Sequence, residues 1–354
     1  MGSVSPLLAI VDEMRHQRPG KDQFLWVGTM TGPEKVVIEN YGIPFMAIAA
    51  GKFRRYLSVE NFFDIFRVFK GYRQVKKILR KFQPNVVLTA GSYVSVPVAK
   101  AAARLKIPYT VHQQDVLPGL ANKLMAKNAM LITVTFPEHV RQFDSKKTVF
   151  TGNPVRPEIL RGDRARAREV FGLREEIPTL LVMGGGTGAI FLNEMVIGGL
   201  GELSKHYQII HITGDNKAIA EAKLPVLPPF QRQRYKQYSF LIEDMKDAYA
   251  LADLVICRSS ASTASELALL GKAVLFVPIP DSHQVQNAVF FKKNNAAFLL
   301  DQKTYKTPEA FVAMIQFLLA HHGDLETVRM NIKHLLKPDA AKRILVEIVK
   351  IEKK

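Results

Sequence analysis

The sequence predicts an α/β protein made of two parallel-sheet domains. Short runs rich in Val, Ile, Leu and Phe alternate with helix-length segments along almost the whole chain. Most of these runs are continuously apolar, which is typical of strands covered by helices on both faces. Strands that alternate with helices usually form a parallel sheet. Both halves of the chain repeat this rhythm, so we expect two similar folds in tandem.

The predicted elements follow one another in regular order. In the first half the strands are residues 23–28, 44–49, 85–90, 108–112, 130–136 and 148–151. In the second half they are residues 179–183, 208–213, 238–242, 254–257, 273–278 and 297–300. Helical patterns lie between them, for example at 94–105, 192–205 and 262–271. The tail 340–354 carries apolar residues at helical spacing, which predicts a closing helix that packs back on the first domain.

The boundary between the domains is predicted within residues 152–156. Gly152 and Pro154 interrupt regular structure there, and a polar stretch then begins a new helix. The predicted domains are therefore residues 1–156, joined by the closing helix 338–354, and residues 157–337. A helical pattern also begins at Leu7, where a domain of this type usually has a strand and a Gly-rich turn. We therefore expect the first strand to be missing and the natural gene to extend upstream by about a strand and a turn.

Composition limits the possible classes of protein. The chain has 354 residues, 47% apolar and 23% charged, which excludes a mainly disordered protein. Lys and Arg exceed Asp and Glu by 49 to 32, and the net charge of +17 favours anionic partners. The single cysteine, Cys257, excludes an intrachain disulfide and is typical of a reducing compartment. No run reaches the roughly 18–20 apolar residues of a membrane span, and residues 1–20 lack a signal-peptide pattern. We therefore expect a cytoplasmic protein.

A Gly-rich turn gives the strongest local signal. Residues 180–189 read LLVMGGGTGA and form a predicted strand, a turn and the start of a helix. Free backbone N–H groups and the helix dipole favour a phosphate at such a place. The spacing is neither a clean dinucleotide fingerprint nor a P-loop. A tight turn without a ligand is the alternative, but four glycines in five residues exceed what a turn needs.

A second polar segment, CRSSASTASE at residues 257–266, follows a predicted strand and opens a helix. Its hydroxyl groups can donate to phosphate or sugar oxygens, and Glu266 can accept both hydroxyls of a ribose. Thr263 and Glu266 also have the spacing of a capping box. The spacing alone leaves both interpretations open.

Three more polar segments follow predicted strands, at residues 90–95, 111–115 and 281–288. Open α/β sheets bind ligands at the carboxyl ends of their strands. Each segment also has a plain structural interpretation as a loop or a helix cap. His112 has a side chain suited to acid–base catalysis, although a hydrogen-bonded histidine at a strand end is the commoner case. We find no metal-ligand spacing, so helix N-termini and cations would have to neutralise a leaving diphosphate.

Residues 51–81 form a basic and aromatic stretch. Its Lys and Arg residues outnumber its two acidic residues, Glu60 and Asp64, and several phenylalanines lie between them. An apolar face flanked by cations suits the surface of an anionic bilayer. A core-facing helix with a solvated basic side and a nucleic-acid patch are the alternatives. The number of phenylalanines favours a membrane surface, and no nucleic-acid module is recognisable.

Together, these segments resemble the MurG-type N-acetylglucosaminyltransferases of glycosyltransferase family 28. The resemblance covers nearly the whole chain, and the order and spacing of its pieces are more specific than any single piece. The matching pieces are residues 91–95, 112–115, 118–123, 152–156, 184–189, 244–253, 257–266, 276–278 and 283–288.

The resemblance implies a GT-B fold, in which two Rossmann-like domains face a cleft. It implies inverting transfer of N-acetylglucosamine from UDP-N-acetylglucosamine to the C4 hydroxyl of the muramyl sugar in undecaprenyl-pyrophosphoryl-MurNAc-pentapeptide, which converts lipid I to lipid II. This step belongs to peptidoglycan synthesis and so to cell shape and division. No cofactor and no nucleic acid are expected. The protein should lie on the inner face of the plasma membrane, bound through residues 51–81.

The resemblance also assigns site residues. Glu266 would bind the ribose, Ile242 would contact uracil through its backbone, and Arg156 at the hinge would approach the donor. The diphosphate would contact the glycine turn and the following helix start, which are Gly185, Gly186, Thr187, Gly188, Ser259, Ser260, Ala261, Ser262 and Thr263. His283, Gln284 and Asn287 would contact the N-acetylglucosamine. The acceptor would lie on Gly2, Ser3, Tyr93, Ser95, Asp115 and Asn122.

The chain departs from the family at the expected general base. The family's histidine in the first turn aligns with Ser3, and its usual glutamate and asparagine after the strand histidine are Gln113 and Asp115. We hypothesise that Asp115 or His112 takes the proton. The alternatives are another GT-B enzyme, such as a glycolipid glycosyltransferase or a sugar-nucleotide epimerase, and a catalytically inactive relative that binds UDP-sugars.

Overall fold

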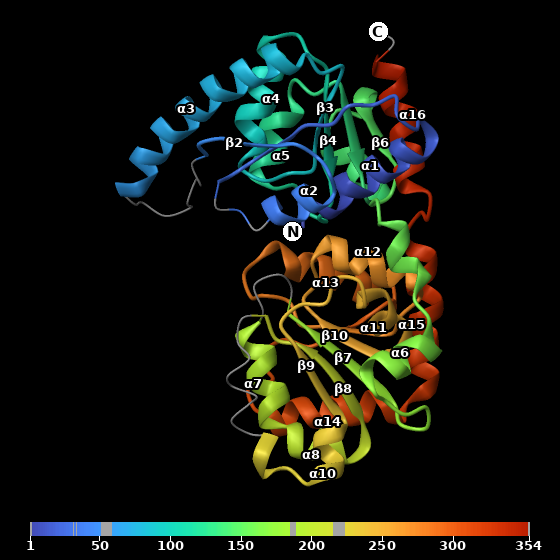
Figure 1. Cartoon of the computed structure of the whole chain (residues 1–354). Helices are drawn as coiled ribbons and strands as arrows, with labels where there is room; N and C mark the ends of the chain where they lie inside the picture. The colour runs from blue at the N-terminus through green and yellow to red at the C-terminus, as the bar shows by residue number, and fades with distance from the viewer. Residues whose placement is uncertain are drawn as a thin grey trace. The chain divides into compact units, whose positions relative to one another are not determined.

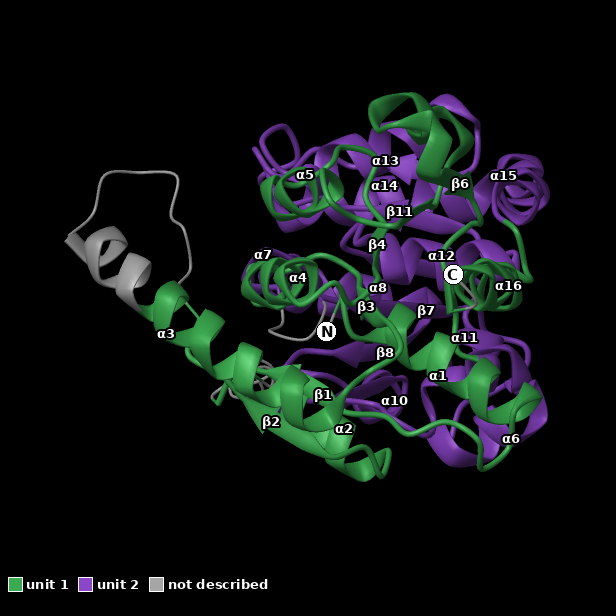
Figure 2. Ribbon diagram, turned by 90° about the horizontal axis from the view of Figure 1, so that it is seen from above, with its two compact units in different colours: residues 1–156, 337–354 green, residues 157–336 purple. Residues whose placement is uncertain are grey.

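The computed structural model describes residues 2–30, 32, 34–50, 59–184, 189–214 and 224–352, with backbone only for 59–66. The chain divides into two compact units, which Figure 2 shows in green and purple. Unit 1 comprises residues 1–156 and 337–354, and unit 2 comprises residues 157–336. Both units contain parallel sheets with helices against them (Figure 1), so the predicted α/β class is confirmed.

Unit 1 contains two parallel sheets. A two-stranded sheet pairs β1 (Trp26–Gly28) with β2 (Phe45–Ala47). A four-stranded sheet follows the chain order β3 (Val87–Thr89), β4 (Tyr109–Gln113), β5 (Leu131–Val134) and β6 (Thr148–Phe150). The helices are α1 (Ser5–Gln17), α2 (Glu34–Asn40), α3 (Val59–Phe82), α4 (Ser95–Arg104), α5 (Leu120–Ala126) and α16 (Ala340–Glu352).

The closing helix α16 packs on α1, as the helical spacing of the tail predicts. Ile344, Leu345 and Ile348 of α16 form a buried cluster with Ile10 and Met14 of α1. Arg18, which follows α1, also forms an ion pair with Glu352 at the end of α16, and Arg18 Nη1 lies 3.0 Å from Glu352 Oε2. Helices α1 and α16, the first and last of the described chain, therefore lie side by side in unit 1 (Figure 1).

Helix α3 lies beside α4 (Figure 1), and over residues 67–82, whose side chains the structure describes, it buries one stripe of its surface. Val75 and Leu79, one helical turn apart, are buried against Val98 and Ala102 of α4. Gly71 continues this stripe one turn earlier, and a Cβ at that position would collide with the Ala49 carbonyl oxygen. The stripe therefore fixes this part of the helix by close packing, and Arg73, Lys77 and Arg80 outside the stripe are exposed.

A cavity of about 660 Å³ separates the two sheets of unit 1. Strands β1 and β3 and helices α1, α3 and α4 all contribute to its walls, which include Leu7, Val27, Leu79, Leu88 and Val98. Among the described residues, β1 pairs with β2 alone. Two bonds show this, from Trp26 N–H to Pro44 O (2.9 Å) and from Ile48 N–H to Gly28 O (2.9 Å). Val27 lies between these residues, so its own amide groups point away from β2, as at a free sheet edge.

Unit 2 has one parallel sheet of six strands in the order β12-β11-β10-β7-β8-β9. The strands are β7 (Thr179–Met183), β8 (Gln208–Ile212), β9 (Tyr235–Tyr238), β10 (Leu254–Cys257), β11 (Val274–Phe276) and β12 (Phe298–Leu299). The helices are α6 (Arg164–Phe171), α7 (Ile190–Gly198), α8 (Leu200–His206), α10 (Pro229–Gln233), α11 (Met245–Leu251), α12 (Ala261–Leu270), α13 (His283–Lys293), α14 (Pro308–Ala320) and α15 (His322–Leu335).

The strand order of unit 2 reverses between β7 and β10. The chain runs outward from β7 through β8 to β9, and then returns to the other side of β7 to form β10, β11 and β12. Such a reversal leaves a crevice at the carboxyl ends of the two central strands, where open α/β sheets bind ligands. The Gly-rich turn follows β7, and the polar segment 257–266 begins at the end of β10.

Two predicted elements of unit 2 are wrong in their bounds. The strand predicted at 238–242 is β9 at Tyr235–Tyr238, which lies at the edge of the sheet and includes the polar residues Lys236 and Gln237. An edge strand exposes side chains, so an apolar pattern does not mark it. The helix predicted at 192–205 is divided into α7 and α8 at Gly199, where a Cβ would collide with Val312.

Candidate functional site

The Gly-rich turn lies between β7 and α7 at the reversal of the sheet in unit 2. The strand ends at Met183 and the helix begins at Ile190. The predicted ligands Gly185, Gly186, Thr187 and Gly188 lie outside the described residues. The flanking elements β7 and α7 lie where the sequence predicts a strand and a helix.

The start of α12 is capped by Ser260. Its hydroxyl oxygen accepts a hydrogen bond from Thr263 N–H (3.3 Å) and the hydroxyl donates to Thr263 Oγ1 (2.9 Å). The capping box proposed for Thr263 and Glu266 is therefore wrong, because the N-cap lies three residues earlier. Ala261, Ser262 and Thr263 form the first turn, whose N–H groups point toward the helix start. Glu266 lies in the second turn and has no capping role.

Two hydrogen bonds join Ser259, predicted to contact the diphosphate, to the helix α13 that carries the predicted sugar ligands. Ser259 Oγ donates to Gln284 O (2.8 Å), and Asn287 Nδ2 donates to Ser259 O (3.0 Å). Ser259 and Asn287 are buried, whereas His283 at the start of α13 is exposed. The Gln284 side chain accepts from Ile279 N–H (3.2 Å). The structure thus places these four residues together at the carboxyl ends of β10 and β11.

Glu266 is half-buried and has a specific partner that the sequence did not indicate. The phenol of Tyr249, from α11, donates to Glu266 Oε2 over 2.9 Å. Tyr249 is fully buried, and from the sequence alone it cannot be distinguished from any other aromatic residue of the core. Ile242, predicted to contact uracil, follows β9 and is 75% exposed. Arg156, the last residue of the first segment of unit 1, is partly exposed.

In unit 1, His112 is buried on β4 and both of its ring nitrogens have partners. Nε2 lies 2.8 Å from Asn153 Oδ1, and Nδ1 lies 2.8 Å from Thr133 Oγ1. Because Asn153 Oδ1 can only accept, Nε2 carries the proton and Nδ1 accepts from the Thr133 hydroxyl. Burial lowers the pKa of His112 to about 4, so the ring is neutral at physiological pH.

Asp115 lies just after β4, in a loop ordered by its neighbour Gln113. The Gln113 side chain donates to Asp115 O (2.7 Å) and to Leu117 O (3.2 Å). Its own oxygen accepts from Asn122 Nδ2 (2.6 Å), and Asn122 also donates to His112 O (3.3 Å). Asp115 itself is partly exposed. Gln113 therefore holds the loop and the start of α5 together, a role that the sequence noted only as a departure from the family.

The turn after β3 approaches the same loop. Gly91 has φ +92°, and a Cβ added there would lie 3.6 Å from Asn122 Oδ1. Ser95 Oγ donates to Gly91 O (2.6 Å), which fixes the turn at the start of α4. Tyr93 and Ser95 line the cavity of unit 1 together with Ser3, and Gly2 beside it is exposed. The predicted acceptor residues of unit 1 are thus neighbours in space.

Within the described residues, no group of three or more His, Cys, Asp or Glu side chains is arranged to hold a metal ion. The helices of the same described part include none with the length and apolar character needed to cross a membrane.

Comparison with known proteins shows the family of the chain. Residues 1–133 match the glycosyltransferase family 28 N-terminal domain and residues 179–344 match its C-terminal domain. Two curated relatives are UDP-N-acetylglucosamine–N-acetylmuramyl-(pentapeptide) pyrophosphoryl-undecaprenol N-acetylglucosamine transferases. The one from Lachnoclostridium phytofermentans is 36% identical over 85% of this chain and 83% of its own. The one from Listeria monocytogenes is 34% identical over 99% of this chain and 97% of its own.

A solved structure agrees with these relatives. The crystal structure of Acinetobacter baumannii MurG is 27% identical, covers 98% of this chain and 96% of its own, and superimposes with a TM-score of 0.70. The expected GT-B fold and the expected family are both confirmed. This chain belongs to glycosyltransferase family 28 and, within it, to the family of the MurG transferases.

Proposed function

We propose that this protein transfers N-acetylglucosamine from UDP-N-acetylglucosamine to the C4 hydroxyl of the muramyl sugar in undecaprenyl-pyrophosphoryl-MurNAc-pentapeptide. The relatives named above support this N-acetylglucosaminyltransferase activity over most of the chain. One structural observation carries the assignment. A carboxylate and a capped helix start lie at the reversal point of the unit 2 sheet, where a nucleotide-sugar would bind.

The donor is proposed to lie on unit 2. Glu266 accepts hydrogen bonds from the ribose, and the backbone of Ile242 contacts uracil. The diphosphate contacts the turn at 185–188 and the start of α12, where N–H groups and the helix dipole favour an anion. His283 and Gln284 contact the N-acetylglucosamine, and the buried Ser259 and Asn287 hold their segment in place through the bonds described above. Arg156 adds positive charge toward the donor.

The reaction is proposed to be an inverting displacement. The C4 hydroxyl of the acceptor loses its proton to a base and attacks the anomeric carbon, and the bond to the diphosphate breaks so that UDP leaves. Negative charge grows on the leaving diphosphate, and helix N–H groups aimed at it stabilise the transition state. We propose that these groups suffice without a cofactor.

Asp115 is the stronger candidate for the base. Its side chain is partly exposed beside the predicted acceptor residues, and a carboxylate can accept the proton directly. His112 is less suited to this role. Its Nδ1, the ring nitrogen with a free lone pair, already accepts a hydrogen bond from the Thr133 hydroxyl, and its Nε2–H donates to Asn153 Oδ1. His112 is then a positioning residue that fixes the end of β4 immediately before Asp115.

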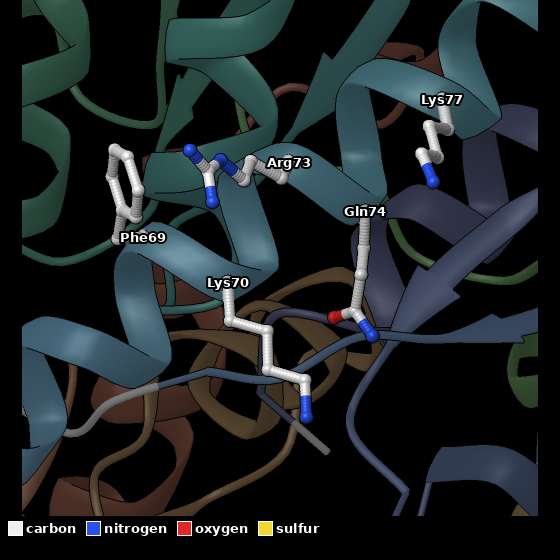
Figure 3. Close-up of a pocket in the computed structure, with 5 residues that line it drawn as sticks. All are labelled: Phe69, Lys70, Arg73, Gln74 and Lys77. Atoms are coloured by element: carbon white, nitrogen blue, oxygen red, sulfur yellow. The ribbon is translucent and has the colours of Figure 1, made fainter.

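The partner of the basic helix α3 is proposed to be an anionic membrane surface on the cytoplasmic side. Figure 3 shows the described part of this face, with Lys70, Arg73 and Lys77 around a shallow pocket of about 200 Å³. Phe69 beside them is 54% exposed, and the Arg73 guanidinium lies over its ring at 4.4 Å. An exposed aromatic ring among cations suits the interfacial region of a bilayer. The predicted residues 51–58 lie outside the described part, as do the side chains of 59–66.

Release of UDP from UDP-N-acetylglucosamine, with and without a lipid I analogue, tests the proposed function. UDP release that depends on the lipid supports the transferase. Release without the lipid would favour an epimerase or a hydrolase, and binding without release would favour an inactive UDP-sugar-binding relative. Repeating the assay with EDTA tests the absence of a metal requirement, because we expect an unchanged rate.

A further inference from the structure

Gln113 is the last residue of β4, and its side chain reaches forward into the loop that carries Asp115. Its Nε2 donates to two carbonyl oxygens of this loop, those of Asp115 (2.7 Å) and Leu117 (3.2 Å). Its Oε1 accepts from Asn122 Nδ2 of α5 over 2.6 Å. The nitrogen and the oxygen of the amide are both used, so one side chain joins β4, the loop and α5.

The backbone of Gln113 is held as firmly as its side chain. Its carbonyl oxygen accepts from the backbone N–H and from the hydroxyl of Thr135, each over 3.1 Å. Gln113 is 1% exposed, and hydrogen bonds in such a place are stronger than they are in water. Asp115 follows only two residues later and is partly exposed. The loop with this carboxylate is therefore attached to a fixed and buried point of unit 1.

Position 113 requires a neutral amide. Backbone carbonyl oxygens only accept hydrogen bonds, so the group that faces those of Asp115 and Leu117 must be a donor. A carboxylate has no donor, and its burial opposite two carbonyl oxygens would be strongly unfavourable. At position 115 the side chain reaches solvent, where a charge is tolerated. The chain thus carries an amide and an acid in the order that these two surroundings require.

We propose that Gln113 is a positioning residue that holds the Asp115 loop in the geometry needed for proton transfer from the acceptor hydroxyl. The inference rests on the proposed function, because it takes Asp115 as the base. In that step the C4 hydroxyl gives its proton to the Asp115 carboxylate while its oxygen bonds to the anomeric carbon, and UDP leaves with the electron pair of the broken bond. A base displaced by about 1 Å can lose a factor of roughly 100 in rate. Gln113 itself takes no proton.

The test uses Gln113→Glu in the full chain and measures kcat against pH with a lipid I analogue. Burial and the two carbonyl oxygens both favour the protonated form of the new carboxyl, so its pKa should lie above the ordinary value. In that form it still donates to one carbonyl oxygen, and kcat should stay within about fivefold of the unchanged chain. As the pH rises it ionises and repels both oxygens, so kcat should fall by roughly 10- to 100-fold.

The unchanged chain should show a different profile. Its kcat should rise as Asp115 loses its proton and then remain level, because the Gln113 amide does not titrate. The KM for UDP-N-acetylglucosamine should be the same in both proteins, since the donor is proposed to lie on unit 2. A level profile in Gln113→Glu would overturn the proposal.

Gln208→Glu is the matched control. Gln208 is 2% exposed, its Nε2 donates to Arg174 O (2.8 Å) and Ile177 O (3.0 Å), and its Oε1 accepts from Arg174 N–H (2.6 Å). The substitution places the same carboxyl opposite two carbonyl oxygens, but at the amino end of β8 in unit 2. It should lower the free energy of unfolding and leave the pH profile of kcat level. The same fall of kcat in both variants would mean that lost stability is the cause, and would overturn the proposal.

Asp115→Asn shows whether Gln113 acts through Asp115. The double variant Gln113→Glu with Asp115→Asn should have the kcat of Asp115→Asn alone, since a positioning residue has no effect without its target. A further loss in the double variant, or full kcat in Asp115→Asn, would overturn the inference. Absence of lipid-dependent UDP release by the unchanged chain would instead refute the proposed function, and the inference with it.

A second substitution serves if Gln113→Glu does not fold. Gln113→Met fills a similar space but has neither the donor nor the acceptor of the amide, so the loop loses its attachment at every pH. Its kcat should be roughly 10- to 100-fold lower across the whole pH range. Gln208→Met should keep full kcat as its control. Full kcat in Gln113→Met would overturn the positioning role.

Discussion

His112 Nε2 lies 2.8 Å from Asn153 Oδ1, and this bond ties β4 to the last segment before the domain boundary. Unit 2 contains a similar pair, because His211 Nε2 on β8 lies 3.0 Å from Asn193 Oδ1 on α7. In both units the other ring nitrogen has a hydroxyl partner, from Thr133 or Tyr235. Burial lowers the pKa of His112 to about 4 and that of His211 to about 3. Both histidines are therefore neutral structural groups.

These buried histidines predict a loss of stability in mild acid. In the unfolded chain a histidine titrates near pH 6.5, so between that pH and about 4 the unfolded state binds a proton that folded His112 does not. The neutral His112 therefore makes its full contribution to the free energy of unfolding above pH 6.5, and this contribution falls as the pH decreases toward 4. For His112 the loss is roughly 3 kcal/mol at most. Urea unfolding at a series of pH values measures it.

His112→Gln checks the assignment of this pH dependence. The amide keeps a donor and an acceptor but does not titrate, so the slope of stability against pH between 6.5 and 4 should become shallower. His322→Gln, which removes an exposed imidazole of unit 2, serves as the control for the loss of a histidine. An unchanged slope in His112→Gln would show that other groups cause the acid sensitivity.

The proposed base gives a second prediction. Asp115→Asn should lower kcat roughly 10²- to 10⁴-fold, the usual contribution of general base catalysis, with little change in KM for the donor. Glu138→Gln removes an exposed acid of unit 1 and should retain full kcat. Steady-state transferase assays with a lipid I analogue measure both. Full activity in Asp115→Asn and in His112→Ala would leave neither residue as the base.

Buried strands could be predicted from the sequence, whereas the edge strand and the tertiary bonds could not. Leu180 and Val182 of β7 lie in a core covered on both faces, so the run reads as continuously apolar. The edge strand β9 carries Lys236 and Gln237 and gives no such signal. The polar segment at Glu266 was singled out because its residue types suit a nucleotide. Its partner Tyr249 was missed, because only the packing of α11 on its neighbours brings the phenol to the carboxylate.

The divided sheet of unit 1 gives a third prediction. The cavity between β1 and β3 is lined by both apolar and polar side chains, and by edges of these strands that pair with no other strand among the described residues, including those at Val27 and Leu88. An extended apolar segment of about five residues placed there would complete the sheet and bury both edges. We expect that such a segment, joined by a Gly-rich turn ahead of Gly2, raises the Tm of unit 1 by several degrees. Hydrogen exchange should show new protection at Val27 and Leu88.

A proline at the centre of the added segment provides the control for this experiment. Proline removes a ladder donor in the middle of a sheet, so the same extension should then neither raise the Tm nor protect the two amides. Equal stabilisation by both extensions would mean that the segment acts by covering apolar surface and does not form a strand in the cavity.

The basic face of α3 predicts binding that depends on lipid charge. Lys70→Glu, Arg73→Glu and Lys77→Glu together should weaken binding to vesicles containing an anionic phospholipid, since each cation near such a surface contributes about 1 kcal/mol. Three losses correspond to roughly a 100-fold weaker affinity, and binding to neutral vesicles should not change. Lys292→Glu, Lys293→Glu and Lys306→Glu, at exposed positions of unit 2, make the same change in net charge and serve as the control. Vesicle sedimentation at two salt concentrations measures both sets. Equal weakening by both would show that net charge alone, and not this helix face, directs the protein to the membrane.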